Sequence, residues 1–144
     1  MEQQLLVLLL PRPLERFHLE AQARELLSAP GAVAVDPARL PVARLPATVA
    51  AGLAVGQAKR MRLPGTPAAV AIFHPLQFYL GGALLARHPT AELWYGEPEA
   101  DDVAPYDQLH TAASERAALR FPVTTDLDIT PLQLRMAELG ILTA

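Results

Sequence analysis

The chain has 144 residues, of which 51% are hydrophobic and 19% are charged. That length suits one domain and leaves little room for a second, and the hydrophobic fraction argues against disorder. Twelve basic and fifteen acidic residues give a net charge of −3, which argues against a basic surface large enough to neutralise the phosphate backbone of a nucleic acid. We therefore predict a globular protein with no nucleic-acid partner.

Two further features narrow the class of protein. The sequence contains no cysteine, so disulfides, thiolate zinc sites, iron–sulfur clusters and cysteine nucleophiles are excluded. The same absence suits a cytoplasmic protein, which is the location we predict. The apolar run at residues 5–10 follows Glu2 and stops at Pro11. It is too short for a membrane span and is flanked unlike a signal peptide, so no membrane span is expected.

The first predicted elements are a strand, a helix and a second strand. Residues Gln4–Leu10 include the run LLVLLL, which shows no polar alternation and is typical of a strand covered on both faces. A helix is predicted at Arg16–Leu27, because apolar residues recur at helical spacing until the breaker at residues 28–31. The next short apolar run, Ala32–Val35, predicts the second strand.

The middle of the chain repeats this alternation. Residues 36–45 contain two prolines and are interpreted as a structured loop. A helix is predicted at Pro46–Met61, with basic residues near its C-terminus, where cations oppose the carbonyl end of the helix dipole. A turn rich in Pro and Gly leads to a strand at Ala68–Phe73, which again lacks polar alternation.

His74 closes this third strand and precedes a predicted helix at Pro75–Arg87, since Pro suits the first position of a helix. The helix contains Gly81-Gly82, which matches neither a dinucleotide fingerprint nor a P-loop and is interpreted as a packing feature. A fourth strand is predicted at Ala91–Tyr95. Within it we expect Trp94 to lie in the core and Tyr95 at the rim of the sheet.

An acidic stretch, Glu97–Asp107, follows the fourth strand and contains no basic residue. Carboxylates suit magnesium or calcium, but the spacing matches no EF-hand, so a solvated loop is preferred and no metal site is predicted.

Three elements complete the predicted chain. Helices are expected at Tyr106–Leu119 and Pro131–Leu139, with a strand at Phe121–Thr124 between them. The last helix is predicted to be capped by Thr130 and ended by Gly140.

Together these elements predict an α/β fold: a single Rossmann-like, three-layer domain over residues 1–144 with a mostly parallel sheet of about five strands. Ligands of such sheets bind beyond the carboxyl ends of the strands. The predicted ligand-binding residues are those that follow the strands: Arg12, His74, Gln77 and Tyr95.

Two of these residues keep a second interpretation. His74 could act as a general base or bind a hydroxylated ligand, or it could cap the strand or bond a nearby carbonyl. Arg12 could pair with an anionic group or be an ordinary surface arginine. No catalytic residue is identified and no cofactor is expected.

Several segments, taken in order, suggest a family: residues 9–17 (LLPRPLERF), 44–46 (RLP) with 57–60 (QAKR), 72–78 (IFHPLQF) and 91–96 (AELWYG). They resemble the N-terminal domain of bacterial group 1, GT-B type glycosyltransferases, over residues 4–126. The resemblance implies a domain that holds the acceptor, with ligand contacts from His74 and Tyr95. In such enzymes a second Rossmann-like domain holds the sugar nucleotide. The resemblance therefore implies that the donor half is missing and that this chain alone transfers no sugar.

Three hypotheses follow. The leading one is a glycosyltransferase-like acceptor-side domain, inactive alone or completed by a second chain that carries a sugar-nucleotide domain. Such an arrangement predicts an exposed apolar patch on the cleft side. The alternative is a stand-alone module that binds a nucleotide or an anionic metabolite, with contacts from Arg12 and His74. The third is a structural protein that forms a homodimer.

Overall fold

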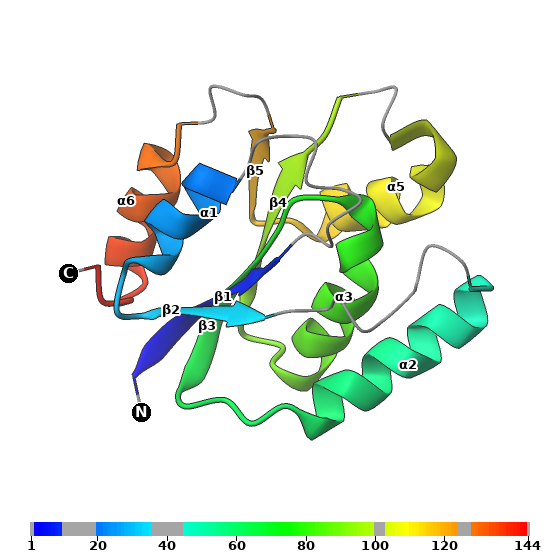
Figure 1. The fold of residues 1–144 in the computed structure, drawn as a ribbon, viewed down its shortest axis with the longest axis horizontal. Helices are drawn as coiled ribbons and strands as arrows, with labels where there is room; N and C mark the ends of the chain where they lie inside the picture. Colours follow the sequence, from blue (N-terminus) through cyan, green and yellow to red (C-terminus); the bar gives the residue numbers. More distant parts are fainter. Residues whose placement is uncertain (1, 10–19, 36–44, 100–102, 124–127, 144) are drawn as a thin grey trace.

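Five parallel strands form the centre of the fold in the order β2-β1-β3-β4-β5 (Figure 1). The computed structural model describes residues 2–9, 20–35, 45–99, 103–123 and 128–143. The order is one of the two common doubly wound orders, so the predicted α/β class and parallel sheet are confirmed. The strands are β1 (Gln3–Leu8), β2 (Ala32–Val35), β3 (Thr66–Ile72), β4 (Glu92–Glu97) and β5 (Leu119–Pro122).

Helices cover both faces of this sheet and give three layers. Helices α1 and α6 lie on one face, and α2, α3 and α5 lie on the other (Figure 1). The helices are α1 (Glu20–Leu27), α2 (Ala47–Arg60), α3 (Phe78–Arg87), α5 (Asp107–Arg116) and α6 (Thr130–Glu138), with short 3-10 turns η3 (Pro75–Gln77) before α3 and η4 (Ala104–Tyr106) before α5.

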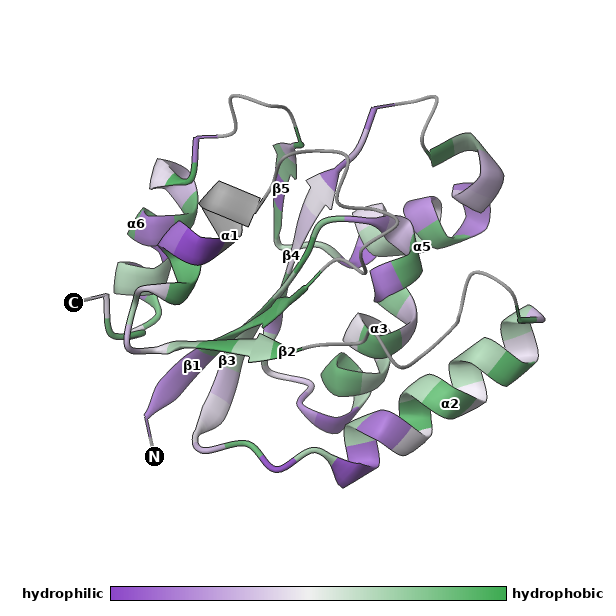
Figure 2. Ribbon diagram, in the orientation of Figure 1, coloured by the Kyte–Doolittle hydropathy of each residue, from purple (hydrophilic) through white to green (hydrophobic). Residues whose placement is uncertain are grey.

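Strand β1 shows why the apolar runs lack polar alternation. Leu5 and Val7 pack with the core under α1 and α6, whereas Leu6 and Leu8 pack with the core under α2, α3 and α5. All four are fully buried because each face has its own helical cover. Figure 2 shows hydrophobic colours along the later parts of β1 and β3, after hydrophilic residues at their starts.

The predicted boundaries hold best at β2, which spans Ala32–Val35 as expected. The predicted helix at Tyr106–Leu119 is too long, since α5 ends at Arg116. Two residues later, the Ala118 amide donates a hydrogen bond to the Leu93 carbonyl of β4 at 2.9 Å. Residues 117–119 were predicted to be helical, but here the chain turns to pair with β4, and β5 begins at Leu119.

The start and end of α6 differ in how well they were predicted. The predicted cap by Thr130 is wrong, because Thr130 is the first residue of the helix and its amide donates to Asp128 Oδ1 at 3.0 Å. The predicted end at Gly140 is confirmed, and its φ of 75° is a left-handed conformation that favours glycine.

Two other glycines allow close packing. A Cβ on Gly81 would lie 3.2 Å from Ile72 Cγ2, so its absence lets α3 sit close to β3, as the packing interpretation predicted. A Cβ on Gly96 would lie 2.7 Å from Val123 Cγ2 and 2.8 Å from a Phe121 ring carbon. Gly96 therefore leaves room for the aromatic core beside β5.

The neighbours Trp94 and Tyr95 are both fully buried, one on each face of the sheet. The core position of Trp94 is confirmed. The rim position predicted for Tyr95 is wrong, because β4 continues to Glu97 and leaves Tyr95 inside the strand, where α5 covers it.

None of the helices in the described ranges combines the length and apolar character needed to cross a membrane.

Candidate functional site

A cavity of about 390 Å³ lies beyond the carboxyl ends of the strands, on the face covered by α2, α3 and α5. Its walls come from the start of α2, from η3 and α3 after β3, and from η4 and α5 after β4. This carboxyl-edge pocket is where open parallel sheets bind their ligands. The lining residues are Leu45, Ala47, Leu76, Tyr79, Ala104, Pro105, Tyr106, Asp107, Gln108 and Leu109.

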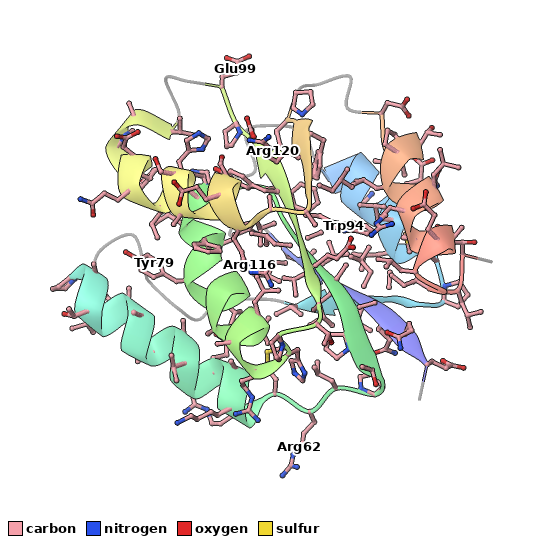
Figure 3. The ribbon with its side chains drawn as sticks, turned by 180° about the vertical axis from the view of Figure 1, so that it is seen from behind. Arg62, Tyr79, Trp94, Glu99, Arg116 and Arg120 are labelled. Carbon is pink, nitrogen blue, oxygen red and sulfur yellow. The ribbon has the colours of Figure 1, made fainter. Side chains whose placement is uncertain are left out.

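The walls of the carboxyl-edge pocket combine aromatic rings with a few polar groups. Tyr79 comes from α3 and lies on the side of that helix near α2 (Figure 3). Tyr106, Asp107 and Gln108 come from the junction of η4 and α5. Leu76 is buried and apolar. Of the lining residues that the structure describes, one carries a carboxylate and none carries a basic side chain.

His74 lies beneath this wall. His74 is 2% exposed, and its Nδ1 accepts a hydrogen bond from the Leu76 amide at 3.1 Å, which caps η3. Its ring meets the Tyr106 ring edge to face, with centroids 5.1 Å apart. His74 thus supports a pocket wall and holds the turn after β3, and its direct contact with a ligand stays a prediction.

Gln77 links β1 and β3, the neighbouring strands between which the order of the sheet reverses. Its Nε2 donates to the Leu8 carbonyl at 2.9 Å, and its Oε1 accepts from the Phe73 amide at 2.6 Å. The residue as a whole is 5% exposed. Gln77 therefore ties the end of β1 to the end of β3 and shapes the floor of the carboxyl edge. Its predicted contact with a ligand remains a prediction.

Tyr95 bonds His110, a residue to which the sequence assigned no role. The Tyr95 hydroxyl lies 2.8 Å from His110 Nδ1, and the two ring centroids are 5.6 Å apart. Burial, with a smaller effect from Glu97, raises the pKa of Tyr95 above its usual range, so the phenol stays protonated at neutral pH. Neither Tyr95 nor His110 lines the carboxyl-edge pocket.

The predicted site residues therefore converge only in part. His74 and Tyr95 both contact the segment from η4 to α5, through Tyr106 and His110 respectively. Arg12 lies outside the described residues, as do Asp101 and Asp102 of the predicted acidic loop. In the ranges that the structure describes, no three His, Asp or Glu side chains come close enough together to hold a metal ion.

Sequence reasoning missed the residues that line the pocket. Tyr79 lies in a predicted helix of which only Gly81 and Gly82 were discussed. Tyr106 was predicted as the first residue of a helix, and Asp107 as the end of the acidic stretch. The signal that the sequence offered was position, because these residues follow the ends of β3 and β4 by seven to ten positions.

A second, smaller hollow of about 320 Å³ lies at the ends of β4 and β5. Glu99 and Arg120 lie near this end of the sheet (Figure 3). Arg120 Nε is 3.9 Å from Glu97 Oε1, and their side chains are 60% and 37% exposed, so solvent weakens their attraction. This hollow offers less enclosure by aromatic side chains than the carboxyl-edge pocket does.

No protein-family model, curated protein or solved structure matches this chain.

Proposed function

We propose that this chain is a glycosyltransferase-like acceptor-side domain that holds a hydroxylated, sugar-like molecule in the carboxyl-edge pocket. Transfer of a sugar would require a second, donor-binding domain or chain. The observation that carries the proposal is the pocket lining, in which Tyr79 and Tyr106 accompany Asp107 and Gln108.

This lining matches the chemistry of a carbohydrate. A sugar ring presents hydroxyl groups at its edge and C–H groups on its faces. Aromatic rings such as Tyr79 and Tyr106 provide rigid apolar area together with a polar hydroxyl. A carboxylate accepts hydrogen bonds from hydroxyls, and the Gln108 amide both donates and accepts. Asp107 and Gln108 can therefore fix the orientation of a polyol in a pocket that both rings line.

The same lining argues against a strongly anionic ligand. A phosphate placed beside Asp107 would meet a like charge, and none of the described lining residues offers a basic side chain. One feature favours the alternative, a module for a nucleotide or an anionic metabolite: α2 begins at the pocket with no side-chain cap on its first amides. We rank the sugar-like ligand first because the carboxylate lies directly on the pocket wall.

A thermal-shift screen of the purified chain separates the two ligand classes. The probes are glucose, mannose, N-acetylglucosamine and maltose in one arm, and ATP, UDP and inorganic phosphate in the other. A ligand at about 100 times its Kd adds about 2.7 kcal/mol to the free energy of unfolding, which raises Tm by several degrees. We expect shifts in the sugar arm. Shifts confined to the phosphate-bearing arm would favour the alternative, and no shift in either arm would contradict both.

Variants then assign the binding to the pocket. Asp107→Asn should weaken sugar binding by about tenfold, because a hydrogen bond to a charged group is lost. The matched control is Gln133→Ala, an exposed position on α6 on the opposite face of the sheet. Equal affinities for the wild type and Asp107→Asn by titration calorimetry would place the ligand elsewhere.

A further inference from the structure

Asp107 brings a negative charge to the carboxyl-edge pocket. Its side chain is exposed, and no ion pair or hydrogen bond with another described residue engages its carboxylate. The carboxylates of Glu92 and Glu97 on the preceding strand, β4, each have an arginine partner. The charge of Asp107 is therefore available to a molecule that enters the pocket.

The backbone around the pocket does not reverse this negative charge. Asp107 stands in the first turn of α5, where it offsets the partial positive charge of that helix end, about half an elementary charge. The N-terminus of α2 also reaches the pocket, through Ala47. Two amides of its first turn, those of Val49 and Ala50, are already taken, since both donate to the Pro46 carbonyl at 3.0 Å. Among the described groups, one full negative charge therefore outweighs the two partial positive charges.

Two tyrosine rings in the same pocket suit a cation as well as a sugar. Tyr79 comes from α3, and Tyr106 directly precedes Asp107. The faces of aromatic rings carry a negative electrostatic potential, which attracts an ammonium group. The Tyr106 ring is supported by the buried ring of His74, with centroids 5.1 Å apart. A hollow of about 390 Å³ thus combines a carboxylate with two aromatic side chains, and this combination favours a positively charged group.

We propose that the ligand of the carboxyl-edge pocket is an amino sugar, whose protonated amine pairs with the Asp107 carboxylate while its hydroxyl groups bond Gln108. This inference rests on the proposed function and narrows its substrate class. A neutral sugar offers Asp107 hydrogen bonds alone, whereas an ammonium group adds a Coulomb attraction to them. A sugar that carries a phosphate or a carboxylate would instead meet repulsion from Asp107.

Titration calorimetry with glucosamine and glucose tests the proposal, because the two sugars differ by an amine in place of one hydroxyl group. At about pH 6 the amine is protonated, and low ionic strength keeps the attraction unscreened. We expect glucosamine to bind about three to five times more tightly than glucose, which is the gain of a partly exposed ion pair. N-acetylglucosamine, whose nitrogen is uncharged, should not show this advantage.

Variants of Asp107 assign the preference to its charge. Asp107→Asn keeps the size of the side chain and removes the charge, so it should abolish the preference for glucosamine over glucose. Asp107→Glu keeps the charge and should retain the preference. Gln133→Ala, at an exposed position of α6 on the opposite face of the sheet, is the control and should behave like the wild type. Far-ultraviolet circular dichroism would confirm that each variant is folded.

The outcomes separate this inference from the function on which it rests. Equal affinities of the wild-type chain for glucosamine and glucose would overturn the amino-sugar assignment and leave sugar binding in place. A preference for glucosamine that persists in Asp107→Asn would overturn the assignment as well, because the charge of Asp107 would not be its cause. If neither glucosamine nor any neutral sugar binds, the proposed function and the amino-sugar assignment fail together.

Discussion

At the scale of single residues, the buried polar side chains at the carboxyl edge serve the backbone. Gln77 bonds the Leu8 carbonyl and the Phe73 amide, and His74 accepts from the Leu76 amide. Buried backbone amides and carbonyls need hydrogen-bond partners. Here side chains supply the partners of the Leu8 carbonyl, the Phe73 amide and the Leu76 amide. These two side chains therefore hold the floor on which the carboxyl-edge pocket is built.

Replacing Gln77 tests this role. Gln77→Met keeps the size of the side chain and removes both hydrogen bonds, which leaves a buried amide and a buried carbonyl without these partners. We expect the free energy of unfolding to fall by about 2–4 kcal/mol, measured by urea unfolding with an unchanged m-value. Gln133→Met on α6 is exposed and should change it by less than about 0.5 kcal/mol. Equal midpoints for the two variants would show that the tie is dispensable.

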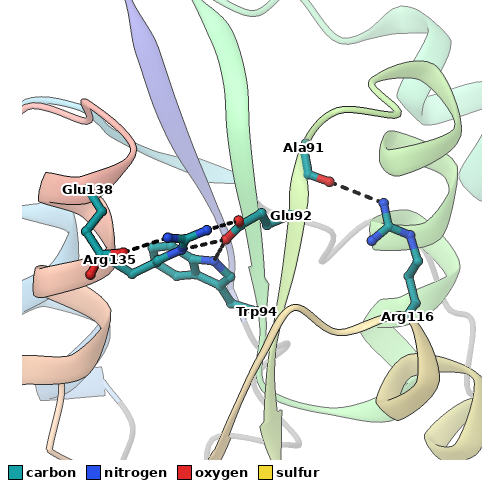
Figure 4. A network of polar contacts seen from close by, with 6 residues as sticks. All are labelled: Ala91, Glu92, Trp94, Arg116, Arg135 and Glu138. Atoms are coloured by element: carbon teal, nitrogen blue, oxygen red, sulfur yellow. Dashed lines mark hydrogen bonds and ion pairs between the residues drawn. The ribbon is translucent and has the colours of Figure 1, made fainter.

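At the scale of elements, a polar network fastens α6 to the start of β4 (Figure 4). Arg135 binds both carboxylate oxygens of Glu92, one of them from Nε at 3.0 Å, and also binds Glu138. The Trp94 indole donates to Glu92 Oε1 at 3.2 Å. On the other face, Arg116 donates to the Ala91 carbonyl at 3.2 Å and so fastens the end of α5 to the same region. Side chains thus hold helices to both faces where β4 begins.

The Glu92 contact makes a pH-dependent contribution to stability. Its hydrogen bond with Arg135 lowers the pKa of Glu92 below the ordinary value of 4.5. A carboxyl with a lowered pKa stabilises the fold fully above its ordinary pKa, and the contribution is lost as pH falls through the lowered value. Glu92→Gln should therefore lower Tm by a few degrees near neutral pH, and its difference from the wild type should shrink in acid below about pH 4.5.

The matched control for this contact is Glu138→Gln. Glu138 also pairs with Arg135, but its side chain is 62% exposed, so its loss should change Tm much less. Differential scanning calorimetry between pH 7 and about pH 3 would measure both variants. A Tm difference for Glu92→Gln that grows as the pH falls would contradict the assigned direction.

At the scale of the whole molecule, the proposed acceptor-side domain would bind one of the two substrates of a glycosyl transfer, the acceptor. Glycosyl transfer needs a donor and an acceptor held in register, and the described residues form a single sheet with the carboxyl-edge pocket at the ends of its strands.

We therefore predict that the isolated chain transfers no sugar. The assay would incubate it with UDP-glucose, GDP-mannose and ADP-glucose in the presence of the sugars that bind the pocket, and would follow release of the nucleoside diphosphate. The expected rate is that of the protein-free blank. If turnover occurs, loss of that turnover in Asp107→Asn would assign it to the pocket and refute the acceptor-only proposal.

The sequence by itself determined the class of fold. Uninterrupted apolar runs such as residues 5–8 and 69–72 require cover on both faces, and alternation with helical segments then implies a parallel sheet. Local signals also placed β2 and the end of α6 at Gly140. These features depend on neighbours within a few residues along the chain, which is the range over which periodicity and backbone conformation act.

The tertiary structure alone decided which residues share the candidate site. Tyr79 and Tyr106 are 27 positions apart and meet at one pocket only because α3 and α5 lie on the same face of the sheet. Tyr95 was predicted at the rim but lies in the core. The helix that covers it, α5, comes later in the chain, so the residues around Tyr95 do not reveal this cover. Side-chain contacts between distant segments depend on which helix covers which face, and no local pattern encodes that choice.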